Sequence, residues 1–116
     1  MSKSILNSIK KLLNRDETDT DFDTDIIIHI NSTLAVLNQL GVGPTEAFAI
    51  TGSTETWDTF LGEGNAYNFI ESYIYMKVKL IFDPPSNTAI IKAYQDSINE
   101  FEYRATILEK DGGSSV

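Results

Sequence analysis

The sequence predicts an all-α protein, a small bundle of three longer helices with a short amphipathic helix before them and an irregular insert among them. Apolar residues recur at spacings of three and four in several stretches, which is typical of helices that bury one face. Proline-containing sequences at 43–44 and 83–85 interrupt these stretches. The 116 residues suffice for one domain, which we expect at 1–110, followed by a flexible tail at 111–116.

The first predicted helix runs from Ser4 to Asn14 and has one apolar stripe, with Lys10 and Lys11 beside it. The stripe consists of Ile5, Ile9, Leu12 and Leu13. We expect this stripe to pack on its own domain or on a neighbouring subunit. A position on a membrane surface is the alternative, but the helix is short and strongly acidic residues follow it.

Residues 16–25 carry six acidic side chains and no basic one: Asp16, Glu17, Asp19, Asp21, Asp23 and Asp25. Their alternation is similar to the start of a calcium-binding loop, but Thr24 and Ile30 occupy the positions that need glycine and glutamate. We therefore expect no metal site here. The acids can cap and complement the start of the following helix, and they can also repel DNA phosphate or engage a basic partner.

The second predicted helix extends from about Phe22 to Leu40, and Gly41 followed by Gly43-Pro44 ends it. Its apolar face consists of Ile27, Ile30, Leu34, Leu37 and Leu40. Residues 44–64 form the irregular insert. Within the insert we expect a short helical turn that Trp57 helps to pin to the core.

The central helix, the second of the three longer ones, is expected from about Asn65 to Phe82, and it is apolar around nearly its whole circumference. Because a domain of this size cannot cover all of that surface, we expect a subunit interface. The residues expected there are Tyr75, Leu80, Phe82, Lys10, Lys11 and Arg15. The three cations are expected to meet the acids at 16–25 of the next subunit. A last helix is expected from about Ser86 to Glu109, with a stripe at Ile91, Tyr94, Ile98, Phe101, Ala105 and Leu108.

The composition excludes several classes of function. The absence of cysteine excludes disulfides and thiolate metal sites, and the formal net charge of −8 disfavours binding to nucleic acid through phosphate neutralisation. His29 lies among isoleucines, so we expect a packed or interfacial histidine and no catalytic residue. We likewise expect no cofactor, no leader peptide and no membrane span, because no apolar run reaches about 18–20 residues.

Five segments carry a resemblance to a known family: residues 39–44, 48–52, 55–62, 73–85 and 100–104. The most specific of them contains Lys77-Val78-Lys79-Leu80-Ile81-Phe82-Asp83-Pro84-Pro85. In this order they resemble the small head–tail connector proteins of tailed bacteriophages, which are also described as adaptor or DNA-packaging proteins. The resemblance extends from about Ser2 to Lys110, nearly the whole chain.

The resemblance implies a structural subunit without catalytic residues that assembles into a ring under the portal, a dodecamer in the virion. The partners that it implies are the portal protein, neighbouring copies and the next head-completion or tail protein, while DNA passes through the channel without specific binding. It implies a location at the head–tail junction, and in the host cytoplasm during assembly. The alternative function is a small acidic regulatory or inhibitory module that captures a basic partner surface with residues 16–25.

Overall fold

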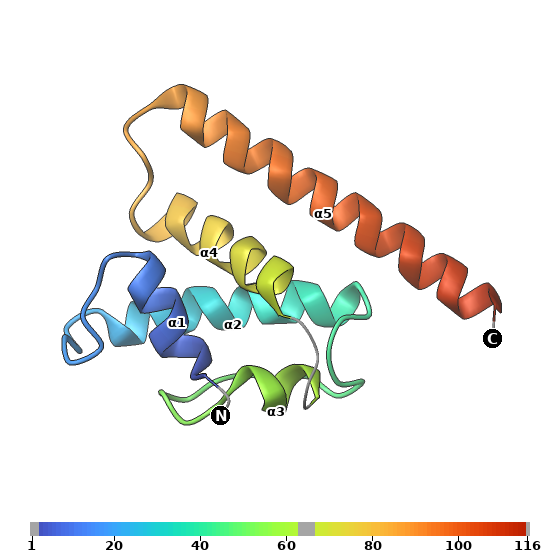
Figure 1. Cartoon of the computed structure of the whole chain (residues 1–116), viewed down its shortest axis with the longest axis horizontal. Coiled ribbons are helices and arrows are strands. Elements are labelled where there is room, and N and C mark those ends of the chain that lie inside the picture. The colour runs from blue at the N-terminus through green and yellow to red at the C-terminus, as the bar shows by residue number, and fades with distance from the viewer. Residues whose placement is uncertain (1–2, 63–66, 116) are drawn as a thin grey trace.

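The computed structural model describes residues 3–62 and 67–115, with side chains described as far as Thr106. Within these ranges the chain has no β-strand, and its helices are α1 (Ile5–Leu12), α2 (Asp23–Gln39), α3 (Trp57–Leu61), α4 (Asn68–Phe82) and α5 (Thr88–Ser115). α2 and α4 pack together at the centre, α1 contacts both, and α5 lies against α4 (Figure 1). The predicted all-α class is therefore confirmed.

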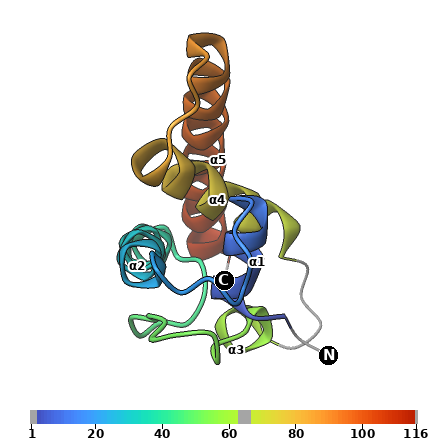
Figure 2. The same cartoon turned by 90° about the vertical axis from the view of Figure 1, so that its left-hand side faces the viewer.

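The hydrophobic core lies where α1, α2 and α4 meet (Figure 2). Each helix contributes residues spaced by three or four positions, so each turns one apolar face inward. The buried residues from these helices are Ile5, Leu6, Ile9, Ile26, Ile30, Leu34, Leu37, Tyr73, Ile74 and Val78. The first helix therefore packs on its own domain, one of the two arrangements that its stripe predicts.

The start of α1 is joined to the insert by backbone hydrogen bonds. Ser4 and Thr56 form an isolated antiparallel bridge, in which the amide of Ile5 donates to the carbonyl of Glu55 (3.0 Å) and that of Trp57 to the carbonyl of Lys3 (3.1 Å). Ser4 also caps α1, because its hydroxyl oxygen accepts from the amide of Asn7. One short contact thus fixes where both segments begin their helices.

The insert is held to the core by side chains of its own and of α2. The side-chain amide of Asn31 binds the backbone of Ile50 twice, donating to its carbonyl (3.0 Å) and accepting from its amide (2.8 Å). Trp57 is buried as predicted, stacks on Tyr67 with centroids 5.2 Å apart, and donates from its indole nitrogen to the hydroxyl of Ser8. These contacts close the core where no regular helix covers it.

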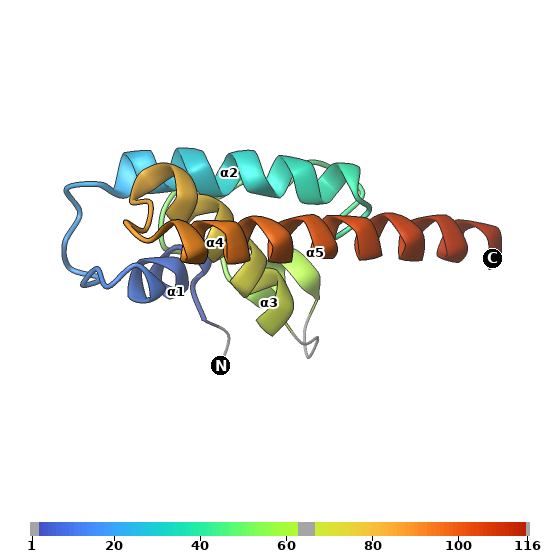
Figure 3. The same cartoon turned by 90° about the horizontal axis from the view of Figure 1, so that it is seen from above.

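α5 is the longest helix and packs mainly on α4. Its carboxyl-terminal turns extend past the end of α2, as Figures 1 and 3 show. Among its described side chains only Ile98 is buried, while Ile91, Tyr94, Phe101 and Ala105 of the predicted stripe are half-buried against α4. The helix therefore leaves most of its surface uncovered within one chain.

Some helix boundaries differ from those predicted. α5 begins at Thr88, after Asn87, whose side-chain oxygen accepts from the amides of Ala89 and Ile90. It continues to Ser115 instead of ending at Glu109, because no proline follows to stop it; the flexibility of the tail stays a prediction.

The starts of α2 and α4 also differ. α2 begins at Asp23 without a side-chain cap, so the acids there complement the helix start by charge alone. The predicted start of the central helix, Asn65, lies outside the described residues.

Candidate functional site

The acidic segment 16–25 is a folded loop that surrounds one cation. The ammonium group of Lys10, on α1, is 1% exposed and lies 2.8 Å from a carboxylate oxygen of Asp23. It also donates to the backbone carbonyls of Glu17 (3.1 Å) and Asp19 (2.7 Å). The ammonium group thus makes two hydrogen bonds and one ion pair inside the chain. Within one chain Lys10 is enclosed by its own acidic segment, and its place at a subunit interface stays a prediction.

The other acids of the segment divide into two groups. Asp16 and Asp19 shape the loop, since their carboxylates accept from the amides of Thr18 (2.9 Å) and Asp21 (3.1 Å). The hydrogen bonds from Thr18 lower the pKa of Asp16. Asp21 and Asp25, by contrast, are exposed at the start of α2 and have no cation within ion-pair distance in the described part of the chain. Glu17 is likewise exposed and without an ion-pair partner among the described residues, so Glu17, Asp21 and Asp25 are the acids that can act on another molecule.

The cations Lys11 and Arg15 have different surroundings. Lys11 is exposed beside Lys3, and both lie near Glu71 of α4. Burial raises the pKa of Glu71, against the opposing effect of the two lysines. The guanidinium of Arg15 lies over the rings of Phe22 (4.6 Å) and Phe82 (5.5 Å), and its ion pair with Asp19 is long, at 3.8 Å.

The predicted interface residues of the central helix are partly covered within the chain. Tyr75, Leu80 and Phe82 are all half-buried. The hydroxyl of Tyr75 lies 3.3 Å from that of Tyr94 on α5, and the ring of Phe82 meets the edge of Phe22 at a centroid distance of 5.7 Å. Burial and the bond to Tyr94 raise the pKa of Tyr75 to about 12. Whether these three residues also contact a neighbour stays a prediction.

The most exposed apolar side chains of α4 are two that sequence reasoning did not select. Phe69, near the start of the helix, is 84% exposed, and Ile81, near its end, is 62% exposed. The sequence shows that this helix is apolar around its circumference. It does not show which sides of the helix α1, α2 and α5 leave uncovered, because that depends on how the Asp83-Pro84-Pro85 turn directs α5.

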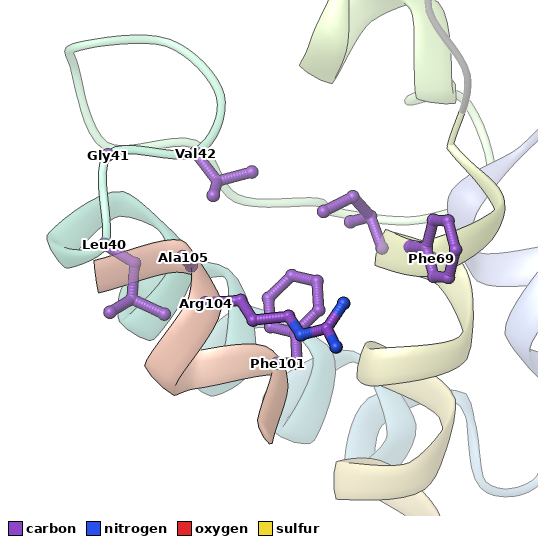
Figure 4. A pocket seen from close by; sticks show the side chains of 8 residues that line it. Leu40, Gly41, Val42, Phe69, Phe101, Arg104 and Ala105 are labelled. Atoms are coloured by element: carbon purple, nitrogen blue, oxygen red, sulfur yellow. The ribbon is translucent and has the colours of Figure 1, made fainter. Parts of the chain in front are cut away.

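An open cleft of about 500 Å³ lies beside Phe69, between the end of α2, the start of α4 and the second half of α5. Its walls are apolar, and one cation, Arg104, crosses it from α5 toward Phe69 (Figure 4). The lining residues are Leu40, Gly41, Val42, Phe69, Ile70, Phe101, Arg104 and Ala105. We call this hollow the Phe69 cleft. This apolar hollow is better suited to binding an apolar side chain of a partner protein than to catalysing a reaction.

Polar contacts join α4 to α5 next to this cleft. The buried Tyr73 donates its hydroxyl hydrogen to a carboxylate oxygen of Glu102 at 2.6 Å, and Lys77 reaches the same oxygen at 3.3 Å. The ring of Tyr73 stacks on Phe101 with centroids 4.3 Å apart. Burial and the bond to Glu102 raise the pKa of Tyr73 well above its usual range. The contact fixes the register of α5 on α4.

His29 is half-buried on α2. In the part of the chain that the structure describes, no three histidine, aspartate or glutamate side chains gather closely enough to hold a metal ion. None of the helices, over the same residues, combines the length and apolar content that crossing a bilayer requires.

Comparison with protein families gives one finding that bears on function. The family model described as phage connector protein matches residues 5–112, nearly the whole chain. Neither the curated proteins nor the solved structures yield a match.

Proposed function

Since the chain belongs to the phage connector protein family, a family of structural proteins of the head–tail connector, we propose that it forms a ring under the portal. The ring would extend the DNA channel and provide the attachment site for the next head-completion or tail protein. We further propose that it matches the portal as a dodecamer, assembles in the host cytoplasm and remains at the head–tail junction of the virion.

The observation that carries this proposal is the uncovered apolar surface of α4 and α5. Phe69, Ile81 and Tyr103 are each more than half exposed in one chain. Phe69 lies beside an apolar cleft, and an exposed apolar side chain of this kind can be covered by a neighbouring subunit. A ring of identical subunits covers such surfaces by repeated contacts between unlike faces.

We propose that the acids Asp21 and Asp25 flank the DNA path and prevent the DNA from binding to the channel wall. Both are exposed at the start of α2 without a cationic partner among the described residues, and like charge repels phosphate over about 8–10 Å at physiological salt. Lys11 and Arg15 remain the cations that can face a neighbouring subunit. The ion pair between Asp23 and Lys10 supports this arrangement, because it stabilises the conformation of the acidic segment 16–25.

The test of the ring is electron microscopy and sedimentation of the full chain with the portal protein of the same phage. We expect closed rings seated coaxially on the portal, with the subunit number of the portal. A chain that stays monomeric or dimeric and never joins the portal would refute the proposal and favour the acidic binding module.

The test of the acids is DNA ejection from particles that carry Asp21→Asn together with Asp25→Asn. Repulsion from the channel wall predicts slower DNA exit at unchanged particle assembly. Glu46→Gln, which removes an exposed charge outside the segment, is the matched control. Unchanged ejection in the double variant would exclude the channel role and leave the ring itself intact.

A further inference from the structure

We propose that the two ends of α4 carry unlike docking faces, and that Ile81 of one copy inserts into the Phe69 cleft of the next copy. This inference rests on the proposed ring and specifies its contact. The second face, which we call the Ile81 face, consists of Ile81, Phe82 and Asp83 at the end of α4 and of Phe22, the residue before α2, whose ring contacts that of Phe82.

The Phe69 cleft has the form of a receiving site. It is concave, its volume of about 500 Å³ accommodates one or two large side chains, and its walls come from three separate segments of the chain. Phe69 at its edge has almost no cover within the chain, at 84% exposed. An apolar hollow of this kind is filled by a partner's apolar side chain in well-packed interfaces.

The Ile81 face has the form of an inserting site. Ile81 is exposed at the last turn of α4, immediately before Asp83-Pro84-Pro85 ends the helix. Phe22 adds a second exposed apolar side chain, held against Phe82 by their edge-on contact and by Arg15. The apolar side chains of this face are therefore presented at an end of the α2–α4 pair.

The relative position of the two faces favours a head-to-tail contact. Phe69 and Ile81 are twelve residues apart on one helix, which separates them by about 18 Å along the axis and turns them by roughly 120° around it. A two-fold contact would need both sites on one side of the molecule, and the turn of about 120° between them disfavours it. Unlike faces of this kind join subunits in series, and the series closes into a ring when the rotation from one subunit to the next permits it.

Charge complementarity identifies a second copy of this chain as the occupant. Arg104 is the cation at the cleft, whereas the exposed acid Asp83 belongs to the Ile81 face. Arg104 and Asp83 each have a partner four residues away, the exposed Glu100 at 2.8 Å and the half-buried Lys79 at 3.1 Å. Surface pairs of this type contribute little, so Arg104 of one copy can pair with Asp83 of the next.

The decisive experiment uses cysteine pairs, since the natural chain has no cysteine. Phe69→Cys and Ile81→Cys in the same chain are too far apart to bridge internally, because a disulfide needs Cα atoms within about 7 Å. We expect mild oxidation of the assembled protein, alone and on the portal, to give a ladder of covalent oligomers. Each single variant should give dimers at most.

Two outcomes overturn the inference. The first is assembly with the portal without a ladder, which leaves the proposed ring standing and removes only this contact. The second is an equally fast ladder from the control pair Phe69→Cys with Ile90→Cys, whose second site is exposed on α5. Failure of the chain to join the portal at all would refute the proposed function as well.

Charge reversal gives an independent readout that does not depend on cysteine reactivity. Arg104→Asp and Asp83→Arg should each lower the assembled fraction about tenfold at a limiting protein concentration, and the two together in one chain should restore it. Melting curves verify that all three variants fold. Additive losses in the double variant would overturn the pairing.

Discussion

α1 and α5 both lie against α4, but the short helix is enclosed and the long one is not. α1 has eight residues, of which Ile5, Leu6, Ile9 and Lys10 are buried. α5 has 28 residues, and among its described side chains Ile98 alone is buried. Helix length therefore does not measure the stability that a helix contributes to this chain. The enclosed helix completes the core, whereas the open helix offers surface to other molecules.

The largest effect should come from removing the cation that α1 buries. Lys10→Met leaves the carboxylate of Asp23 and two backbone carbonyls without their donor, and we expect the free energy of unfolding to fall by about 3–5 kcal/mol. Urea denaturation measures this loss. Adding Asp23→Asn should recover part of it, and a loss below about 1 kcal/mol would show that α1 is not enclosed as described.

Matched truncations in the two helices test the contrast directly. Ile9→Ala in α1 removes a fully buried side chain, and we expect a loss of about 3 kcal/mol. Ile98→Ala in α5 should cost less, about 2 kcal/mol in the isolated subunit, because α5 packs mainly on one helix, α4. Equal losses in denaturation experiments would contradict the view that α5 is the open region.

The insert belongs to the enclosed region, and Gly43 tests its packing. Gly43 has a φ of +89°, and a Cβ atom there would lie 2.4 Å from Cε1 of Phe60. We expect Gly43→Ala to cost about 2 kcal/mol through strain and displacement of that ring. Gly52→Ala, where a Cβ would meet nothing within 4 Å, is the control and should leave the melting temperature nearly unchanged.

The smallest loss of stability at neutral pH is expected from a substitution in the contact between α4 and α5. Tyr73→Phe removes the hydrogen bond to Glu102 and should cost about 1 kcal/mol at pH 7. Because the pKa of Tyr73 is raised in the folded protein, the unfolded chain loses this proton first. Stability is therefore complete below about pH 10 and falls above it. The variant should lose less stability between pH 10 and 12, as measured by denaturation across that range.

The fold was largely predictable because its helices carry regular apolar stripes. The spacing of Ile30, Leu34 and Leu37 and the proline stop at Asp83-Pro84-Pro85 placed helices close to where they are. The ends were less predictable, as the extension of α5 through Gly112 and Gly113 demonstrates. Glycine disfavours a helix by only about 1 kcal/mol, whereas proline interrupts it.

The candidate site was less predictable, since it depends on which surfaces remain uncovered. Lys10 shares a helical face with Leu6 and Leu13, and this spacing, followed by an acidic segment, was a readable signal for a buried cation. Phe69 gave no such signal. Its exposure follows from the angle between α4 and α5, which no local pattern in the sequence specifies.

The bridge between Ser4 and Thr56 has a consequence for when the chain can fold during its synthesis. α1 leaves the ribosome well before the strand-like partner that pairs with it, because 52 positions separate Ser4 from Thr56. At about 5–20 residues per second, that interval is roughly 3–10 s. During those seconds the stripe of Ile5, Leu6 and Ile9 lacks the rest of its core, and it is the part of the nascent chain that a holding chaperone would meet first.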